Sequence, residues 1–552
     1  MDKDIHNRLS SGSPAQEADA GKGREEAGTA TKGHPASQHA QQTAANKEPS
    51  ASFFAKDRRF LDPNWEENSF FQSIKEQYLT YQSNVLQFFE AADAPPADKK
   101  KTLFWVKFFL DACSPSNFPF TNPAVLQKTI AQNGENFING IKNFWTDFIF
   151  NPYLVPPLTN TESFELGKNI ATTKGSIVFQ NDIFQLIQYD PVLKHTHKSP
   201  VLLIPSWINK YYLFDLSQDN SFVKFNLAQG RTVFTLSWAN PTKEHCDFSM
   251  HDYLEAGINT AIDTTYKINK EHLPPDCATK DMTVNVIAMC VGGTFFLAKL
   301  AEACAADEPF PVGSVTLLMA PLDFRFLEWI NLFISEPFLQ NQSVGCLEKK
   351  GVLLGEIFTK IFCCLRANDL IWPNYVERYL LGNELPSLDF LYWNHDTPRI
   401  PLKMLFECIN NFFFKNQFFA QKTDEFGAFL QEGLKKIKNH MFVFGTERDH
   451  VVPWESCFSA AQIFPNLKFV LGGAGHIVGC INPPHKHKYY YYENTIKKGQ
   501  KAEDWRSSAN KKQGSWWTTW NTWQQQFDGG EIASYMATSF LEEAPGSFAK
   551  QR

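Results

Sequence analysis

Three residues that lie far apart in the sequence have the side chains needed for nucleophilic catalysis at an acyl carbon: Cys290, Asp449 and His476. A cysteine thiolate attacks such a carbon readily, an imidazole can take up the thiol proton and later return it, and a carboxylate can orient the imidazole. This chemistry requires the three groups to meet at one place. The sequence therefore has to supply elements that bring them together.

The residues around Cys290 predict a buried strand, a sharp turn and a helix. Residues 284–289 contain strand formers and no charge, which is typical of a central parallel strand. Gly292 and Gly293 would let the following helix pack closely on this strand, and the turn would lift the thiol above the sheet edge in a strained conformation. Ala288 stands where the turn pattern usually has glycine, but alanine is the next smallest residue, so the turn can still form. Taken alone, the string also fits a buried, inert core cysteine.

Asp449 is the carboxylate that we expect to act as the acid. It lies in a loop directly after a predicted strand of residues 440–445, and two valines and a proline follow shortly after it. Glu447 is the other acidic residue of this loop, and we expect it to pair with Arg448 at the surface. An aspartate in a loop is also common as a turn or cap residue, so the assignment depends on the rest of the pattern.

His476 is the residue that we expect to act as the base. It lies in the segment Gly472-Gly-Ala-Gly475-His476-Ile-Val-Gly479, which follows the last predicted strand, residues 467–471. A loop of small residues would let the imidazole lean over the sheet edge towards Cys290. His450, next to Asp449, is the competing histidine, and a structural role is the alternative for either one.

The order of these residues along the chain, nucleophile, acid and then base, is the order of α/β-hydrolases. In such enzymes two backbone N–H groups hold the oxyanion that forms during acyl transfer. Val291 N–H would be the first donor, at the start of the helix after Cys290. The second should come from the loop after the third predicted strand, Pro205-Ser-Trp-Ile208-Asn-Lys-Tyr-Tyr212, and we choose Ile208 N–H. The alternative for this loop is a simple turn bounded by proline.

The predicted elements fit the α/β class. Two strands that flank Asn181-Asp182 indicate a hairpin. Further strands at residues 200–205, 232–238, 284–289, 314–320, 440–445 and 467–471 alternate with helices. We therefore expect residues 166–552 to form an α/β-hydrolase fold whose mainly parallel, doubly wound sheet ends at residues 467–471. The strand pattern stops at about residues 322–420, where we expect a cap insertion over the active site.

Two regions are expected before the sheet. Residues 53–165 should form a helical N-terminal domain, because large apolar residues such as Phe70, Phe71, Ile74 and Tyr78 recur at three- and four-residue spacing. Residues 1–52 are rich in small and polar residues, so we expect a disordered tail that is neither a signal peptide nor a membrane anchor. No run in the sequence approaches about 18 apolar residues, so we expect no transmembrane segment.

The composition argues against some classes of function. The net charge is −6 with scattered lysines, so we expect no nucleic-acid partner. The 11 cysteines are irregularly spaced, so we expect neither a metal site nor disulfides, but a reducing cytoplasm. The 50 phenylalanines indicate either a phenylalanine-rich core or an apolar surface for a hydrophobic partner. We expect some members of the cluster at residues 412–414 and 418–419 to face solvent and to bind a second subunit or a polymer.

Several motifs give the sequence a resemblance to the polyhydroxyalkanoate synthases, from about Phe53 to the last residue. They are Asp57-Arg-Arg-Phe60, Ile208-Asn-Lys-Tyr-Tyr212, Cys290-Val-Gly-Gly-Thr294, Asn368-Asp-Leu-Ile-Trp372, Asp449-His-Val-Val-Pro-Trp454, Gly475-His476 followed by Asn482-Pro-Pro484, and Gly514-Ser-Trp-Trp517. The length resembles the single-subunit forms, class I rather than class II. Ala288 and Trp207 depart from the family pattern, in which glycine and smaller residues are common, and both departures concern the shape of the entrance.

The resemblance implies an acyltransferase that polymerises 3-hydroxyacyl-CoA, of short chain such as 3-hydroxybutyryl-CoA, into polyhydroxyalkanoate with release of CoA. It implies a covalent thioester at Cys290, no cofactor, and the CoA thioester and the growing polyester chain as partners. It also implies a homodimer, located in the cytoplasm at polyester granules with granule-associated proteins. Two alternatives stay open: a cysteine-dependent thioesterase or dienelactone-type hydrolase of the same fold, and a non-catalytic granule-binding protein.

Overall fold

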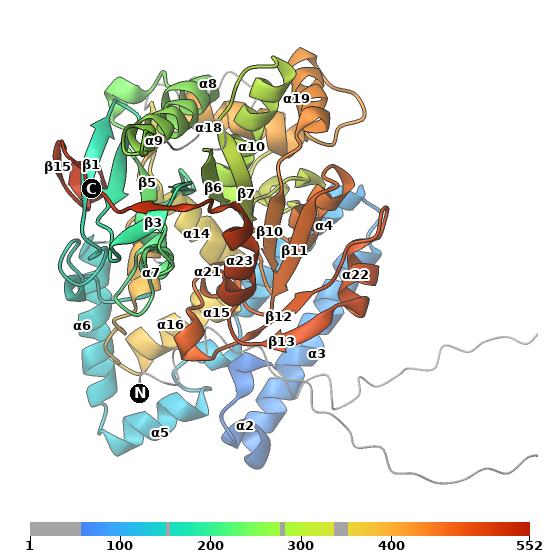
Figure 1. Ribbon diagram of the computed structural model, residues 1–552. Coiled ribbons are helices and arrows are strands. Elements are labelled where there is room, and N and C mark those ends of the chain that lie inside the picture. The colour runs from blue at the N-terminus through green and yellow to red at the C-terminus, as the bar shows by residue number, and fades with distance from the viewer. Residues whose placement is uncertain (1–56, 151–154, 276–281, 336–350) are drawn as a thin grey trace, which may run out of the picture.

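A large sheet forms the centre of the computed structural model, which describes residues 57–150, 155–275, 282–335 and 351–552 (Figure 1). Within these residues eleven strands pair in one sheet. Across the sheet they are β13 (Asn510–Gln513), β12 (Tyr490–Glu493), β11 (Leu467–Gly472), β10 (Met441–Thr446), β7 (Val312–Leu318), β6 (Val284–Met289), β4 (Val201–Ile204), β5 (Val233–Trp238), β2 (Phe184–Tyr189), β1 (Gly175–Gln180) and β15 (Glu542–Glu543). The strands from β11 to β5 are parallel, and antiparallel strands extend both edges.

The predicted strands are confirmed, but the predicted end of the sheet was wrong. β4, β6 and β10 are buried along their whole length, which explains why each is a short run of mostly apolar residues. Beyond β11, however, β12 and β13 continue the sheet. β13 has the sequence Asn510-Lys-Lys-Gln513 and is exposed throughout, so it lacks the apolar alternation that would predict a strand. Its lysines are typical of an edge strand that must not pair with another molecule.

Two groups of helices pack around the sheet. In the first, α7 (Phe222–Ala228) contacts α23 (Trp517–Gln524) through Phe222 and Trp520, whose rings lie 5.0 Å apart, and Trp520 Nε1 donates a hydrogen bond of 3.0 Å to Thr316 of β7. The second group comprises η6 (Tyr253–Asn259), α9 (Thr260–Glu271), α10 (Cys290–Ala305) and α19 (Glu425–Lys436). Helices α10 and α19 approach so closely that a Cβ atom at Gly433 would overlap the backbone of Ala301.

Shorter elements complete this part of the chain. They are η4 (Tyr211–Phe214), η5 (Lys243–His245), α8 (Met250–Asp252), α20 (Trp454–Phe458), η11 (Ser459–Gln462), α21 (His476–Cys480), η12 (Pro484–Lys486), α22 (Ala502–Ser508), η13 (Gln525–Phe527) and α24 (Gly546–Lys550), with a small sheet of β3 (His195–His197) and β14 (Glu531–Ala533).

Helices fill most of the described residues before the sheet, as the apolar spacing predicts. They are η1 (Arg58–Phe60), α2 (Asn64–Glu67), α3 (Ser69–Ala91), α4 (Pro96–Ala112), η2 (Pro115–Asn117), α5 (Pro123–Ala131), α6 (Glu135–Phe150) and η3 (Thr161–Ser163). The expected disordered tail, residues 1–52, lies outside the described residues. The boundaries of the three predicted domains stay a prediction.

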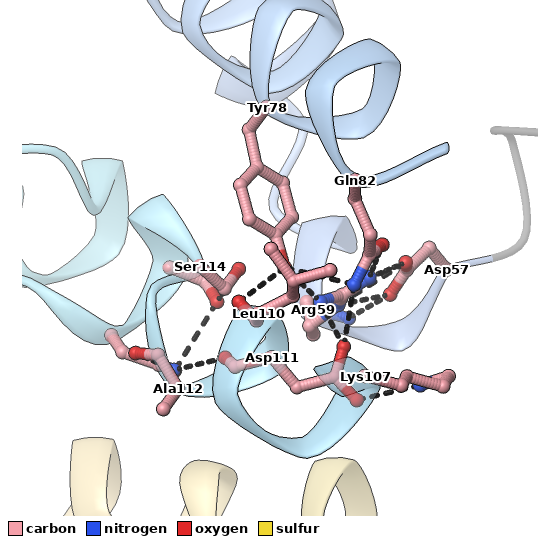
Figure 2. A network of polar contacts seen from close by, with 11 residues as sticks. Asp57, Arg59, Tyr78, Gln82, Lys107, Leu110, Asp111, Ala112 and Ser114 are labelled. Atoms are coloured by element: carbon pink, nitrogen blue, oxygen red, sulfur yellow. Dashed lines mark hydrogen bonds and ion pairs between the residues drawn. The ribbon is translucent and has the colours of Figure 1, made fainter. Parts of the chain in front are cut away.

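A polar network around Arg59 joins η1 to α3 and α4 (Figure 2). Arg59 pairs with Asp57 (Nη2 to Oδ2, 2.6 Å) and with Asp111 (Nη1 to Oδ1, 2.9 Å), and it donates a hydrogen bond of 2.7 Å to the hydroxyl of Tyr78. Lys107 also pairs with Asp111, at 2.6 Å. The Arg59 side chain is only 6% exposed, so these contacts replace the water that it loses on folding. The motif that begins at Asp57 is therefore an anchor for the N-terminal helices.

Replacing Arg59 with methionine should destabilise the protein by about 2–3 kcal/mol, because Asp111 would stay buried after losing one of its two cations. Urea denaturation followed by circular dichroism measures this loss. Arg58→Met is the matched control from the same motif. Arg58 is 38% exposed in its pair with Asp369, so its replacement should cost less than about 1 kcal/mol. Equal losses of unfolding free energy in the two variants would show that the burial of Arg59 does not make its ion pairs more stabilising than the exposed pair of Arg58.

The predicted cap, residues 322–420, is largely helical where the structure describes it. Its elements are η8 (Phe324–Phe326), α11 (Ile330–Phe333), β8 (Val352–Leu353), α14 (Glu356–Leu365), α15 (Ala367–Leu370), α16 (Trp372–Tyr375), η9 (Val376–Leu380), α17 (Asp389–His395), β9 (Ile400–Pro401), α18 (Leu402–Cys408) and η10 (Ile409–Phe414). The N-terminal helices contact this segment: Arg378 of η9 donates to Asp147 of α6 at 2.9 Å, and Trp105 of α4 donates to the carbonyl of Leu332 at 3.4 Å. Figure 1 shows α6 beside the yellow cap helices.

The phenylalanine cluster of the cap is packed inside the protein. Phe412 is 0% and Phe418 is 4% exposed, and the other three members are half-buried against the core. Phe324 of η8 stacks on Phe412 at a ring distance of 5.6 Å and meets Phe413 edge to face at 4.8 Å. No member of the cluster is fully exposed, and the expected contact with a second subunit or a polymer stays a prediction. Many of the large exposed apolar residues lie on the N-terminal helices, among them Phe70, Phe88, Phe109, Ile130, Ile138, Ile141, Trp145 and Ile149.

Candidate active site

Cys290 lies at the turn between β6 and α10, in the strained conformation that the sequence predicts. Its φ is +52°, a left-handed value that costs a residue with a Cβ atom about 1 kcal/mol or more. The turn is as tight as the glycines predict: a Cβ atom at Gly292 would overlap the carbonyl of Pro205, and one at Gly293 would come within 2.6 Å of Ala320 Cβ. Ala288 is accommodated in this turn and is fully buried. The local sequence therefore builds a nucleophile elbow with a cysteine at its tip.

Asp449 and His476 meet in the structure although 27 positions separate them. His476 Nδ1 and Asp449 Oδ2 lie 2.5 Å apart. Asp449 is held in place by hydrogen bonds from the N–H groups of Val451 and Val452, both 2.9 Å long, and from the hydroxyl of Thr446. Its side chain is 0% exposed. Burial alone would raise the pKa of Asp449, but the His476 charge and the hydrogen bonds hold that pKa below its usual value.

The electrostatics of His476 favour its protonated form. Burial alone would lower the pKa of His476, but Asp449 and the Cys290 side chain, which also contacts the imidazole, raise this pKa to about 10. The imidazole therefore has Asp449 on one side and the cysteine sulfur on the other. Such an arrangement can hold a thiolate and can pass a proton between the sulfur and a reacting group.

The two competing residues lie in other surroundings. Glu447 accepts hydrogen bonds from Arg506 (2.6 Å) and from the hydroxyl of Tyr490 (2.9 Å), so the predicted partner Arg448 was wrong. Tyr490 and Arg506 come from the C-terminal elements β12 and α22, which the sequence did not predict. His450 lies beside the candidate site, but its Nδ1 atom has no hydrogen-bond partner among the residues that the structure describes. The assignment of Asp449 and His476 as acid and base agrees with this geometry and stays a prediction.

His450 makes the protein sensitive to acid. Burial lowers the pKa of His450 to about 4, below the value of about 6.5 in an unfolded chain. Between these pH values the unfolded chain binds a proton that the folded chain does not, so stability present above pH 6.5 should be lost as the pH falls through 4. We expect a loss on the order of 2 kcal/mol between pH 6.5 and 4, and a smaller one in His450→Gln. Urea denaturation of both proteins at several pH values tests this, and identical pH profiles would refute it.

The two predicted oxyanion donors lie beside the same cavity as Cys290. Val291 is the second residue of α10, so its N–H group is among those without a partner inside the helix. Ile208 N–H, in contrast, donates a hydrogen bond of 3.2 Å to the hydroxyl of Ser206 in its own loop. Ile208 would therefore have to exchange this partner for an oxyanion. Both assignments stay predictions.

The cavity next to Cys290 and His476 has a volume of about 190 Å³ and is mostly apolar. The cap supplies about half of the lining residues, among them Leu327, Trp329, Phe358, Phe362, Leu370, Phe390, Trp393, Leu405, Ile409 and Phe413. Lys210, Arg366 and Asp369 are polar members that we did not single out from the sequence. The signal that could have found Lys210 and Asp369 is that each is the one charged residue of its motif, residues 208–212 and 368–372. Arg366 lies two positions before the second motif.

Within the described ranges no three His, Cys, Asp or Glu side chains are grouped so as to hold a metal ion. None of the described helices is long and apolar enough to cross a membrane.

The sheet order, the elbow and the histidine–aspartate pair define the class of the protein: it has the α/β-hydrolase fold. Comparison with known sequences narrows the class to a family. Residues 56–226 match a family model described as the N-terminus of poly-beta-hydroxybutyrate polymerase (PhaC). The chain is 34% identical to a poly(3-hydroxyalkanoate) polymerase subunit PhaC from Rhizobium etli, covering 90% of this chain and 77% of that protein. The corresponding subunit from Cupriavidus necator is 31% identical, over 90% of this chain and 83% of that protein.

The chain therefore belongs to the poly(3-hydroxyalkanoate) polymerase family, and the resemblance predicted from its motifs is confirmed. Among solved structures, the monoacylglycerol lipase of Paleococcus ferrophilus matches at 11% identity with a TM-score of 0.29, over 53% of this chain and 90% of that chain. The assignment to class I rather than class II stays a prediction.

Proposed function

We propose that this protein polymerises 3-hydroxyacyl-CoA into polyhydroxyalkanoate and releases CoA through a thioester at Cys290. The observation that carries the proposal is a cysteine on a nucleophile elbow that faces the His476–Asp449 pair beside an apolar, capped cavity. Membership of the polymerase family supports the choice of substrate. The chemistry needs no cofactor, because the CoA thioester is itself the activated substrate.

In the first step the Cys290 thiolate attacks the carbonyl carbon of the acyl-CoA thioester. The carbonyl oxygen becomes an oxyanion, which Val291 N–H and, once released from Ser206, Ile208 N–H would hold. When the intermediate collapses, the bond to the CoA sulfur breaks and the acyl group stays on Cys290. The imidazolium of His476 gives its proton to the leaving CoA thiolate, so the imidazole is then neutral and ready to act as a base.

In the second step a 3-hydroxyl group attacks the Cys290 thioester. The hydroxyl belongs to another monomer or to the growing chain, and neutral His476 removes its proton while Asp449 orients the ring and stabilises the imidazolium. An ester bond forms, and the bond between the acyl carbon and Cys290 sulfur breaks. The thiolate and the imidazolium are restored, so the cycle can repeat.

A cysteine and a dry cavity both suit this reaction. Exchange of one thioester for another costs little free energy, so the acyl group on Cys290 stays reactive towards an alcohol. Water would compete with the 3-hydroxyl for the same thioester, and the aromatic wall supplied by the cap is suited to excluding it. The cavity of about 190 Å³ is smaller than most ligand pockets, which favours short monomers such as 3-hydroxybutyryl-CoA.

Incubation with 3-hydroxybutyryl-CoA tests the proposal, with free CoA and insoluble polyester measured in the same sample. Release of CoA together with polymer supports it. Release of CoA without polymer would indicate the alternative thioesterase or dienelactone-type hydrolase, and neither product would indicate a non-catalytic granule-binding protein. A parallel assay with 3-hydroxyoctanoyl-CoA tests the preference for short chains, and a faster reaction with the longer monomer would refute it.

We also propose that the protein is a cytoplasmic homodimer that attaches to polyester granules, where it meets granule-associated proteins. The support for attachment is an exposed apolar stripe on α6. Ile138, Ile141, Trp145 and Ile149 recur at three- and four-residue spacing and are 56–70% exposed. An apolar stripe of this kind, left without a partner on the described protein, suits contact with a hydrophobic surface.

Introducing lysines at two positions of the stripe, Ile141→Lys and Trp145→Lys, should release most of the protein from polyester granules. Each side chain buried at the granule contributes about 1–2 kcal/mol, so losing two should weaken attachment at least about tenfold. Co-sedimentation with preformed poly(3-hydroxybutyrate) granules measures the bound fraction.

The control for charge is Gln132→Lys with Thr146→Lys, which adds two lysines at exposed polar positions of the same region. This variant should bind granules as the wild type does, and both variants should keep the wild-type rate of CoA release in solution. Unchanged binding of the Ile141→Lys, Trp145→Lys variant would show that α6 does not form the attachment surface.

A further inference from the structure

The loop of residues 205–210, which carries the predicted donor Ile208, is fixed to the elbow at its first residue. The carbonyl of Pro205 accepts a hydrogen bond of 3.0 Å from Trp238 Nε1. The same carbonyl lies so close to Gly292 that a Cβ atom there would overlap it. The loop therefore rests directly on the first turn of α10, one residue beyond Val291.

The other end of this loop is held by Lys210. Its ammonium group donates hydrogen bonds to Asp396 Oδ1 (2.7 Å) and to the carbonyls of Ala549 and Gln551 (both 2.8 Å). The Lys210 carbonyl in turn accepts a hydrogen bond of 2.7 Å from Trp393 Nε1. Both the backbone and the side chain of Lys210 are therefore fixed.

The ammonium group has no donor left for a substrate. A lysine carries three N–H donors, and three acceptors lie within 2.8 Å. The Lys210 side chain is 5% and the Asp396 side chain 12% exposed, so solvent does little to weaken the pair. Tyr212 donates a hydrogen bond of 2.7 Å to the second oxygen of Asp396 and so fixes that carboxylate as well. Lys210 is thus arranged to hold other groups rather than to react.

We propose that Lys210 is a positioning residue that couples the segment at residues 546–552 to the oxyanion loop. It keeps the loop N–H groups at the correct distance from Val291 N–H, so this segment affects catalysis although it contributes no reacting group. The inference rests on the proposed function only in requiring that an acyl group is transferred to Cys290. It assigns the carbonyls of Ala549 and Gln551 a role in transition-state stabilisation that acts through Lys210.

The test compares two reactions of the same sulfur. Acylation of Cys290 by p-nitrophenyl acetate passes through an oxyanion, whereas its alkylation by iodoacetamide does not. In Lys210→Met the acylation rate, measured as the burst of p-nitrophenol, should fall at least about tenfold, because a misplaced donor loses much of its effect. The alkylation rate, followed by mass spectrometry of the Cys290 peptide, should stay within about twofold of the wild type.

Two further variants and one control make the result decisive. Asp396→Asn keeps the shape of the partner side chain, and a chain that stops after Phe548 lacks both carbonyl acceptors, so both should show the same selective loss. Lys75→Met removes a buried ammonium that pairs with Glu66, far in sequence from the loop, and should change neither rate. Acylation within twofold of the wild type in Lys210→Met, or a parallel fall of both rates in all folded variants, would overturn the proposal. Because p-nitrophenyl acetate requires no polymerisation, a failure of the proposed function would show separately as absence of polymer.

Discussion

Replacing Cys290 with alanine should reduce the release of CoA from 3-hydroxybutyryl-CoA at least about 10³-fold while the protein stays folded. The geometry explains both parts of this expectation. The His476 imidazole contacts the sulfur of Cys290. Without this sulfur the acyl group of the substrate has no covalent acceptor. Alanine keeps the Cβ atom at a φ of +52°, so the strain of the elbow is unchanged. A coupled assay for free CoA and a thermal unfolding curve measure the two effects.

Cys408→Ala is the matched control for this experiment. Cys408 is buried beside the same cavity, and burial raises the pKa of its thiol, which makes it a poor nucleophile. Its replacement should leave the rate of CoA release within a few-fold of the wild type. More than a few per cent of wild-type activity in Cys290→Ala would exclude Cys290 as the nucleophile, and loss of activity in Cys408→Ala alone would move the reaction to the other thiol.

The sequence could predict the elbow because its signals are local. A strand that is buried on both faces has to be apolar, and the glycines after Cys290 are needed where α10 touches the backbone of Pro205 and the side chain of Ala320. Asp449 and His476, the predicted acid and base, could be placed near each other because each lies in the loop after a strand, β10 or β11. Strands that are parallel and adjacent end at the same edge of the sheet, so residues after them come together.

The features that the sequence did not predict depend on contacts between distant residues. Glu447 pairs with Arg506, 59 positions away, and Arg58 pairs with Asp369, 311 positions away. The spacing of residues along the chain cannot predict such long-range ion pairs. The exposed strand β13 was not predicted because neither of its faces is buried, so its sequence has no apolar alternation to indicate a strand. Helical spacing likewise does not show that Phe324 of η8 covers Phe412 and Phe413, two members of the phenylalanine cluster of which some were expected to face solvent.

Replacing Asp449 with asparagine should slow polymer growth by about 10³- to 10⁴-fold, a larger loss than in the first acylation of Cys290. Asp449 Oδ1 accepts the N–H groups of Val451 and Val452, so the asparagine oxygen should occupy that position. Its amide NH₂ group would then face His476 Nδ1 and would select the tautomer with the proton on Nε2. That tautomer cannot take a proton from the attacking hydroxyl.

The two steps should differ because a thiol and an alcohol differ in acidity. A thiol with the ordinary pKa of about 8.5 is partly ionised near neutral pH even without a base, whereas an alcohol needs a base in order to attack. Acylation of Cys290 by 3-hydroxybutyryl-CoA, followed by mass spectrometry, should therefore persist in Asp449→Asn while insoluble polymer does not accumulate. Glu447→Gln is the control from the same loop, because Glu447 binds Arg506 and Tyr490 and not the imidazole. If Glu447→Gln stopped chain growth and Asp449→Asn did not, Glu447 would be the acid, and the pairing of Asp449 with His476 would be structural.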